Sequence, residues 1–474
     1  MTDTLDGSSG TPSAPATLVR DQCLAPGRPP VGRDASGTDD GYGRLFPELP
    51  ALVDGRGFVA DHGRAAVAGE DSPFVLVDDD EDDAEAAAGW PFFAQLLAHE
   101  LTADRSPLVA TADVGGLRNA RRARLDLESL YGADPGGSPY LRRRDDPAQL
   151  LLQPLQGGGH DLPRNHEGVA IIGDPRNDVH RPIAQLTVAL ARLHNRLVDD
   201  LRAAGTPEGR LFDDARRELT WLVQSVVLDD YLPTTVGADL TSSVRDGDVR
   251  WFRPDGPPVL PLEFADAAFR YGHSQVRERY RLTSRSEAVC LFPDLLGFRT
   301  MPAEQAVEWS MLFDLPGHPP APQRAKRIDE RLVPSLIRLP VEVTGGVDDE
   351  SHRSLAIRDL ERGFATGLPS GEAVARRMGI EPLDAGELDL ERLGWGHETP
   401  LWFYVLKESQ VREGGDRLGP VGGRIVAEVL VTVIEADPDS VTRAGRGRSS
   451  ALRGLDGGPV RLGALLEIVD RPTG

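Results

Sequence analysis

Apolar residues recur at helical spacing over most of the chain. The clearest case follows Pro182, where one face carries Ile183, Leu186, Leu190, Leu193, Leu197 and Leu201. Proline suits the first turn of a helix, so this pattern predicts a long core helix that begins near residue 182. Comparable spacing predicts helices at 90–101, 212–232, 302–313, 327–339, 401–411 and 421–436. Pro233 is expected to end the helix at 212–232.

The segment 263–280 is a further helix candidate that contains a histidine. One side of it is apolar and is formed by Ala267, Ala268, Tyr271 and Val276. That arrangement points His273 toward the interior. A lone buried histidine is most often a hydrogen-bonded core residue, and the spacing alone leaves this alternative open.

Gln95 and His99 lie four residues apart in the segment 90–101, so both project from one face of the predicted helix. Leu97 and Leu101 pack on the other side. An ordinary amphipathic helix with two polar residues at its edge would show the same spacing.

The chain reads as one mainly α domain over 42–440, because no internal repeat and no alternation of strands and helices is present. A PDGPP turn between two short extended pieces predicts a small hairpin at 249–264. Residues 1–41 are rich in Gly, Ser, Thr and Pro, which predicts a disordered N-terminal tail. Residues 441–474 are expected to form a partly ordered C-terminal tail, and the acidic run 78–83 a solvated loop.

Charge and cysteine content exclude several classes of protein. There are 75 acidic residues against 53 basic ones, which gives a net charge of −22 at pH 7. This balance argues against a nucleic-acid partner or an anionic membrane surface. Cys23 and Cys290 are too few for a disulfide framework, and no apolar stretch reaches the roughly 20 residues of a membrane span. With no leader peptide evident, we expect a cytoplasmic protein; the sequence leaves its oligomeric state open.

Four stretches resemble the animal haem peroxidase family, within the peroxidase–cyclooxygenase superfamily. They are AQLLAHEL at 94–101, GDPRND at 173–178 with the helix that follows it to HNR at 194–196, FRYGHS at 269–274, and SLAIRDLERGFATGLPSG at 354–371. They occur in the family's order, and the similarity extends from about residue 44 to about residue 439. The resemblance implies the family's mainly α fold, in which haem is held between core helices.

On one side of the haem, the resemblance makes His273 the axial ligand of the iron and places Arg362 at a haem propionate. Asp359 stands where the family has an asparagine that touches the axial histidine. An axial imidazole needs an acceptor for its other ring nitrogen, and a carboxylate supplies one. Alternatively, Asp359 pairs with Arg358 or Arg362 on the helix surface.

On the peroxide side, the resemblance implies Gln95, His99 and Arg176. Splitting bound peroxide needs a base that takes a proton from one oxygen and returns it to the other, which fits His99. Arg176 supplies fixed positive charge where the O–O bond polarises. Gln95 would order water or substrate beside His99.

The segment 121–132 resembles the family's calcium loop, and the resemblance gives Glu100, Asp126 and Glu128 as calcium ligands. Calcium takes about six to eight oxygen ligands, whereas this loop has Arg122 and Arg124 where the family usually has a threonine and a carbonyl-bearing neutral residue. We therefore expect Arg122 to replace the ion by pairing with Glu100 or Asp126.

Two positions depart from the family's covalent haem attachment. In its myeloperoxidase-like members, an aspartate before the distal histidine and a glutamate three residues after the distal arginine form ester links to haem. Here these positions hold Ala98 and Val179, which cannot form esters. We therefore expect haem b to be bound noncovalently. Without the links, the high potential needed to oxidise chloride is not expected.

The resemblance implies a haem peroxidase, an oxidoreductase that reduces hydrogen peroxide through a ferryl intermediate and oxidises a small-molecule electron donor. Two alternatives stay open. A fatty-acid oxygenase of the cyclooxygenase type would carry a radical-forming tyrosine three residues before the axial histidine, where this chain has Arg270; Tyr271 is two residues before it. A haem-binding protein without turnover would need neither His99 nor Arg176, so we favour the peroxidase.

Overall fold

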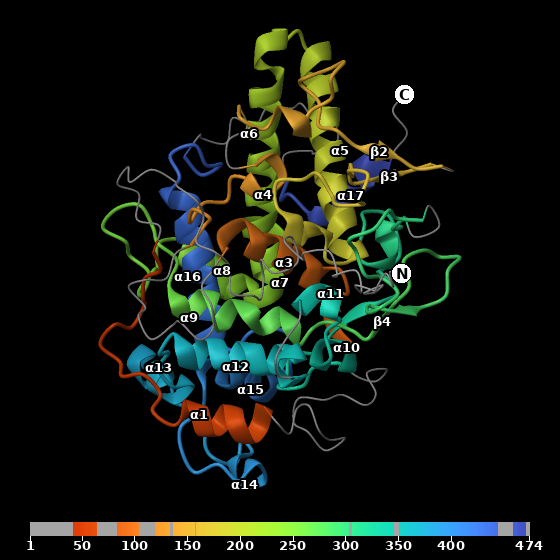
Figure 1. Ribbon diagram of the computed structural model, residues 1–474. Helices are drawn as coiled ribbons and strands as arrows, with labels where there is room; N and C mark the ends of the chain where they lie inside the picture. Colours follow the sequence, from red (N-terminus) through yellow and green to blue (C-terminus); the bar gives the residue numbers. More distant parts are fainter. Residues whose placement is uncertain are drawn as a thin grey trace, which may run out of the picture.

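The structure is a computed structural model that describes residues 41–63, 83–103, 119–132, 136–156, 158–302, 306–345, 350–443 and 458–470. Two long helices, α5 (Arg181–Ala203) and α6 (Glu208–Val226), pack side by side and project from the body at the top of Figure 1. The predicted N-terminal tail (1–41) and the acidic run (78–83) lie outside the described residues, apart from one residue at the end of each.

The other helices are shorter, and several of them pack against α15 (Leu401–Glu413) or α16 (Pro420–Ala436). The shorter helices besides these two are α1 (Gly55–Phe58), α3 (Trp90–Leu101), α4 (Glu128–Tyr131), α7 (Leu232–Val236), α8 (Ala238–Arg245), α9 (Leu262–Ala265), α10 (Pro334–Ile337), α11 (Val341–Thr344), α12 (Leu355–Ala365), α13 (Gly371–Met378), α14 (Leu390–Leu393) and α17 (Leu462–Asp470). Short 3-10 or π turns are η2 (Val59–Gly63), η5 (Pro139–Leu141), η6 (Pro175–Asp178), η7 (Val227–Tyr231), η8 (Ala268–His273), η10 (Trp309–Met311) and η11 (Glu350–Arg353).

Strands are few and short in the described residues. The antiparallel pairs are β1 (Asp83–Ala87) with β6 (Arg324–Lys326), β2 (Gln153–Pro154) with β3 (His160–Asp161), and β4 (Arg279–Tyr280) with β5 (Val289–Cys290). The mainly α fold class predicted from the sequence is confirmed.

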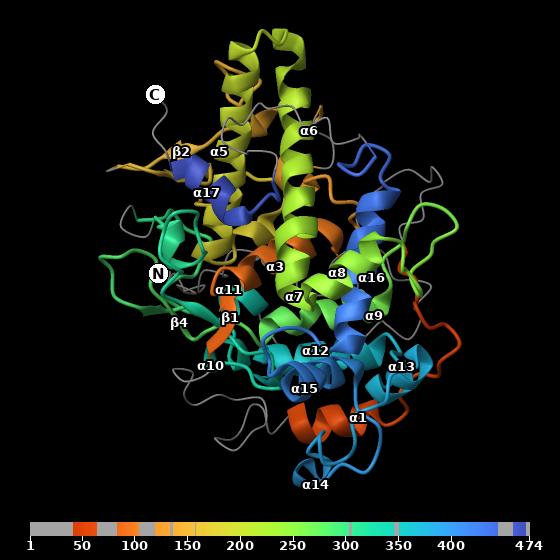
Figure 2. The same ribbon diagram turned by 180° about the vertical axis from the view of Figure 1, so that it is seen from behind.

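The core lies between α15, α16 and the helices that pack against them. α15 is buried from Leu401 through Ser409, so it is surrounded by protein rather than showing one face to solvent. Seen from behind, α16 lies beside α8 and α9 (Figure 2). The six apolar residues predicted to face the core from α5 are all buried, which confirms that helix. In the predicted C-terminal tail, α17 packs against α5.

The segment 263–280 is not one continuous helix. α9 ends at Ala265, Ala267 leaves the helical conformation with φ −137° and ψ −79°, and the 3-10 helix η8 then runs to His273. The side chain of Arg270 donates from Nε to the Ala265 carbonyl at 3.0 Å, which holds the chain across this break.

The predicted hairpin at 249–264 is also wrong. The backbone N–H groups of Arg250, Trp251 and Phe252 donate to the carboxylate of Glu428 on α16, at 2.9, 2.7 and 3.0 Å. Because a buried side chain satisfies these donors, the stretch needs no partner strand.

Three helix predictions need correction. At 302–313 the described residues form only η10, and at 327–339 only α10, because Val333 is held extended before Pro334. The helix predicted at 212–232 does not end at Pro233. It continues through η7 and α7 to Val236, because Pro233 lies in the first turn of α7, where proline's missing N–H is not required.

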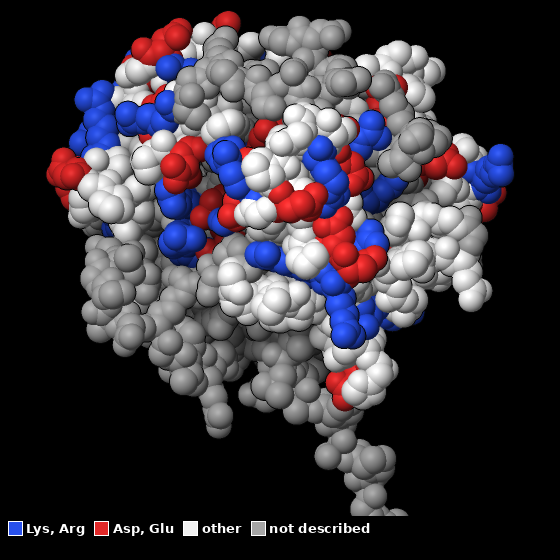
Figure 3. All heavy atoms as spheres, turned by 90° about the horizontal axis from the view of Figure 1, so that it is seen from above, with Lys and Arg blue, Asp and Glu red and all other residues white. Residues whose placement is uncertain are grey.

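The face seen from above in Figure 3 carries acidic and basic side chains side by side rather than in separate patches. Arg202 at the end of α5 is typical, because it pairs with Asp146 at 3.0 Å and with Glu208 at 2.9 Å. No helix within the described residues is long and apolar enough to cross a membrane.

Candidate functional site

One cavity brings together most of the residues that the sequence singled out. Its volume is about 220 Å³, and its walls come mainly from α3, η6, the α9–η8 segment and α12. Five predicted site residues line it: Gln95, His99, Arg176, His273 and Arg362. Much of the remaining lining is apolar, including Phe92, Phe269, Phe292, Leu336 and Leu339. Residues from all four motifs thus meet at one cavity.

α3 carries Gln95 and His99 into this cavity from one face. His99 is buried, and its Nδ1 lies 2.8 Å from Oδ1 of Asn177 in η6. Because an amide oxygen only accepts, His99 donates from Nδ1, which leaves Nε2 as the basic nitrogen. Burial, and then the positive charge of Arg176, lowers the pKa of His99 to about 3. The imidazole is therefore neutral and able to accept a proton.

Arg176 is fixed against the same turn. Its Nε donates to Oδ1 of Asp174 at 3.0 Å, and one terminal nitrogen donates to Oδ2 at 2.7 Å and to the His99 carbonyl at 2.8 Å. Burial alone would raise the pKa of Asp174, but Arg176 and Arg121 outweigh it and lower that pKa well below its usual range. The bidentate pair with Asp174 holds the charged guanidinium of Arg176 in a fixed orientation beside His99.

A glycine explains why η6 can approach so closely. A Cβ on Gly173 would lie 2.6 Å from the carbonyl oxygen of Ser129, so only glycine fits between η6 and α4. The glycine of the GDPRND motif therefore allows close packing against α4, and after it Asp174 holds Arg176 in the cavity wall.

His180 is a site residue that the sequence reasoning missed. It lines the cavity, and its Nε2 lies 2.8 Å from Oε1 of Gln95. Its Nδ1 accepts from the backbone N–H of Ile183 at 3.4 Å, so His180 caps α5 and donates to Gln95 from Nε2. Burial and then nearby His99 lower its pKa to about 3. Its position two residues before Pro182, where a helix cap is expected, was the available signal.

In another part of the cavity lining, His273 of η8 is anchored by a buried carboxylate. Its Nδ1 lies 2.6 Å from Oδ2 of Asp359, which is 0% exposed on α12. The other carboxylate oxygen, Oδ1, accepts from a terminal nitrogen of Arg270 at 2.9 Å. Asp359 therefore faces His273 and Arg270 in the interior. The alternative in which it pairs with Arg358 or Arg362 on the helix surface is wrong.

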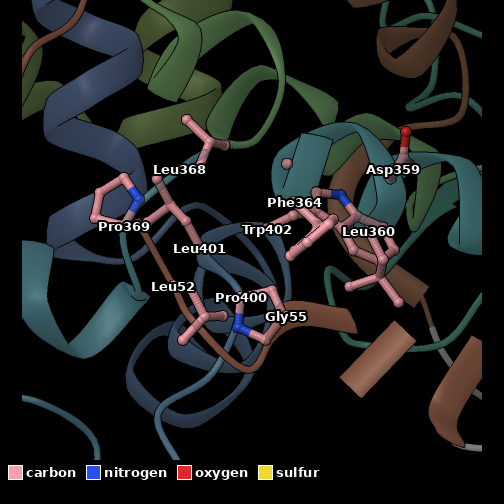
Figure 4. A pocket seen from close by; sticks show the side chains of 11 residues that line it. Leu52, Gly55, Asp359, Leu360, Phe364, Leu368, Pro369, Pro400, Leu401 and Trp402 are labelled. Atoms are coloured by element: carbon pink, nitrogen blue, oxygen red, sulfur yellow. The ribbon is translucent and has the colours of Figure 1, made fainter. Parts of the chain in front are cut away.

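Apolar side chains close off the rear of this carboxylate. Figure 4 shows Leu360, Phe364, Leu401 and Trp402 around a small pocket between α1, α12 and α15, with the Asp359 carboxylate pointing away from them. This backing excludes water, so the bonds that Asp359 makes to His273 and Arg270 act in a low-dielectric setting.

The chemistry of the lining fits a mostly apolar cofactor with an iron centre and carboxylate arms. His99 comes from α3 and His273 from η8, and each is anchored through Nδ1. Within the described chain neither Nε2 has a hydrogen-bond partner, so both are available to the cavity. Buried Arg362 adds a cation to the lining, which suits a carboxylate arm.

The residues proposed for calcium lie outside the cavity and are bonded within the protein. Glu100 accepts from the backbone N–H groups of Glu128 and Ser129 at 2.5 and 2.9 Å. Arg122 pairs with Asp126 at 3.0 Å, one of the two pairings predicted for it. Buried Arg121, which the sequence reasoning overlooked, pairs with Glu128 at 3.1 Å. Among the described residues, no group of three or more His, Cys, Asp or Glu side chains could hold a metal ion.

Comparison with known proteins shows the family to which the chain is similar. Residues 87–383 match the family model described as animal haem peroxidase. The chorion peroxidase of Drosophila melanogaster is 24% identical over 357 residues, covering 70% of this chain and 40% of that protein. Myeloperoxidase of Homo sapiens is 24% identical over 346 residues, covering 64% of this chain and 44% of that protein. The matched segments thus span less than half the length of these curated relatives.

Solved structures share the fold at lower identity. Peroxidase A from Dictyostelium discoideum superposes with a TM-score of 0.64 at 15% identity, covering 90% of this chain and 93% of that chain. A fatty acid alpha-dioxygenase from Oryza sativa superposes with a TM-score of 0.63 at 13% identity, covering 94% and 87%. The fold is therefore common to peroxidases and dioxygenases. The family is decided by the sequence, because the animal haem peroxidase model matches more than half of it. The chain belongs to the animal haem peroxidase family.

Proposed function

We propose that the protein binds haem b noncovalently in this cavity and reduces hydrogen peroxide while oxidising a small-molecule electron donor. The observation that carries the proposal is one cavity lined by two imidazoles that are each anchored through Nδ1, namely His99, which lies beside Arg176, and His273. Bound haem would supply the iron that polarises peroxide and accepts its oxidising equivalents. His273 would hold the iron, and Arg362 a propionate.

The remaining chemistry falls to the chain's own groups. Nε2 of His99 would take a proton from one oxygen of the peroxide and return it to the other oxygen, which leaves as water. Arg176, held in place by Asp174, stabilises the negative charge that develops on that oxygen. Gln95 is oriented by the N–H of His180, so its amide can order water or substrate beside His99.

The position of Tyr271 favours peroxidase over fatty-acid oxygenase. Its hydroxyl lies 2.7 Å from that of Tyr231, and the cavity lining at this point is Arg270 and Gly272. The deciding experiment adds peroxide to haem-loaded protein and then either a phenolic reductant or a polyunsaturated fatty acid. We expect the reductant to restore the resting spectrum. Oxygen uptake on adding the fatty acid, with no response to the reductant, would contradict the proposal.

Haem is expected to be extractable. Ala98 and Val179 line the cavity and have no carboxyl group, and Asp266, the single carboxylate among the described lining residues, pairs with Arg270 at 3.4 Å. Acidified organic solvent should therefore remove the pigment from denatured protein as unmodified haem b. Pigment that stays with the polypeptide through denaturing chromatography would show a covalent link.

Replacing Asp359 with asparagine is expected to raise the ferric/ferrous reduction potential without loss of haem. The carboxylate gives His273 partial imidazolate character, which favours ferric iron, whereas an amide accepts the same hydrogen bond without the charge. Arg270 pairs with the same carboxylate and already moderates its charge. A spectroelectrochemical titration measures the change. Glu361→Gln is the matched control, because Glu361 lies on the same helix but pairs with His352; an equal shift in both variants would refute the role of Asp359.

At the calcium-like loop, we propose that arginine side chains take the place of the ion. The support is the pairing of Arg121 with Glu128 and of Arg122 with Asp126, which neutralises two of the three carboxylates assigned to calcium. Burial, and then repulsion from Asp126, raises the pKa of the third, Glu100, to about 7.

A further inference from the structure

A second cavity lies behind the N-terminal end of α3. Its volume is about 620 Å³, within the range of about 300–1,000 Å³ typical of small-molecule sites. Its walls come from β1, the η7–α7 segment, the loop at 313–316, the end of α15 and the start of α17. Trp90, the first residue of α3, lines it and is only partly buried. None of the residues that line the haem cavity lines this one.

A line of oxidisable side chains leads inward from that tryptophan. The rings of Trp90 and Tyr231 have centroids 5.9 Å apart, which is within the usual spacing of packed aromatic pairs. The hydroxyl of Tyr231 lies 2.7 Å from that of Tyr271, and both tyrosines are buried. Tyr271 is separated from His273 by Gly272 alone, within the same 3-10 helix. The haem peroxidase chemistry proposed above uses none of these three side chains.

We propose that the cavity at Trp90 is a second donor-oxidation site, from which electrons pass through Trp90, Tyr231 and Tyr271 to the haem. This inference rests on the proposed peroxidase function. The site would serve electron-rich aromatic amines or phenols that are too large for the haem cavity. A donor held there needs only to touch Trp90, because the relay carries the electron the rest of the way.

The transfers balance with peroxide as the sole oxidant. Two donor molecules, each with an O–H or N–H bond, give up one electron and one proton each and leave as radicals. The two electrons and two protons convert one hydrogen peroxide to two waters. Within the relay, an oxidised Tyr271 passes its phenolic proton to the oxygen of Tyr231 at 2.7 Å or of Thr235 at 3.3 Å, and recovers it when the next electron arrives.

The charge of the cavity indicates which donors it prefers. Five carboxylates line it against two arginines: Glu85, Asp230, Asp314, Glu413 and Asp416, with Arg417 and Arg461. Some of these charges neutralise one another, as in the pairs Arg417–Glu413 at 2.6 Å and Arg461–Asp230 at 2.8 Å. The excess is negative, so a cationic aromatic donor is attracted and an anionic one is repelled. The preference should weaken as salt is added.

The first test detects the radical rather than turnover. Haem-loaded protein is mixed with one equivalent of peroxide and a nitrone spin trap, and the adducts are located by peptide mass spectrometry. We expect an adduct on Trp90 in the parent protein. Tyr231→Phe keeps the packed ring but removes the hydroxyl contact to Tyr271, so the Trp90 adduct should disappear although Trp90 is present. Trp221→Phe is the matched control, because Trp221 lies on α6 and donates to the carbonyl of Asp439; its Trp90 adduct should match the parent.

The second test compares donors of different size and charge. Trp90→Phe and Tyr231→Phe should lower turnover of a cationic triarylmethane dye that carries N–H amino groups about tenfold or more, while oxidation of a small phenol changes by less than about twofold. An anionic dye of similar size should be a poor donor for every variant. If the small phenol is oxidised but dye turnover is the same in all variants and no adduct forms on Trp90, the relay is refuted and the peroxidase function stands. If peroxide does not change the haem spectrum at all, both proposals fail.

Discussion

Replacing His273 with alanine is expected to abolish the five-coordinate, histidine-ligated haem spectrum. Apart from His99, which is assigned to the peroxide, His273 is the one histidine in the described cavity lining that is anchored through one ring nitrogen and open at the other. Alanine leaves the iron without an axial ligand, while Asp359 keeps its partner Arg270 and so is not left as an unpaired buried charge. Absorption spectra of the reconstituted variant in the ferric, ferrous and carbonyl forms measure the effect.

Added imidazole provides a sharper version of this test, because it can enter the space that the side chain leaves and restore the nitrogen ligand. His166→Ala is the control, since the His166 side chain is 89% exposed and lies outside the cavity. An unchanged Soret band and unchanged carbon monoxide binding in the His273 variant would show that another residue holds the iron.

Replacing His99 and Arg176 is expected to slow the reaction with peroxide while leaving haem content near normal. A positioned acid–base group typically contributes about 10²–10⁴ in rate, and the His99→Ala variant should lose a factor in that range. In Arg176→Ala, Asp174 keeps its bond to Arg121, so the fold at η6 should survive. Stopped-flow spectra of haem-loaded variants with excess peroxide give the rate, and the pyridine–haem assay gives the cofactor content.

The pH dependence of the parent enzyme adds an independent check on His99. Its pKa is lowered to about 3, so Nε2 stays unprotonated as the pH falls from about 7 to about 5. The rate should therefore be nearly constant over that range, whereas a base with the ordinary histidine pKa of about 6.5 would lose most of its activity. His160→Ala is the control for the variants. If a variant that combines His99→Ala and Arg176→Ala reacts with peroxide as fast as the parent, the proton acceptor lies elsewhere, and His160 and His166 become the candidates.

Local sequence patterns determined where several helices form and which of their side chains share a face. The 3.6-residue spacing after Pro182 predicted α5, because a helix that packs along its length must repeat its apolar side chains at that period. The same reasoning put Gln95 and His99 on one face of α3. Family resemblance supplied the partners from other segments, such as Arg176 and Asp359, which periodicity does not connect.

Tertiary contacts decided the rest, because buried polar groups take whichever partner lies nearest in space. The carboxylate of Glu428 removed the need for a hairpin at 250–252, and no signal within that segment reveals a partner almost two hundred residues away. Arg270 and His273 share Asp359, and His180 orients Gln95, although each pair is more than eighty residues apart. At the calcium-like loop, the packing buries Arg121 against Glu128, so Arg121 pairs with a carboxylate there as well as the predicted Arg122. The sequence alone determined the long helices, such as α5, and the kinds of side chain available. The packing of distant segments determined where other predicted helices break and which atoms the side chains contact.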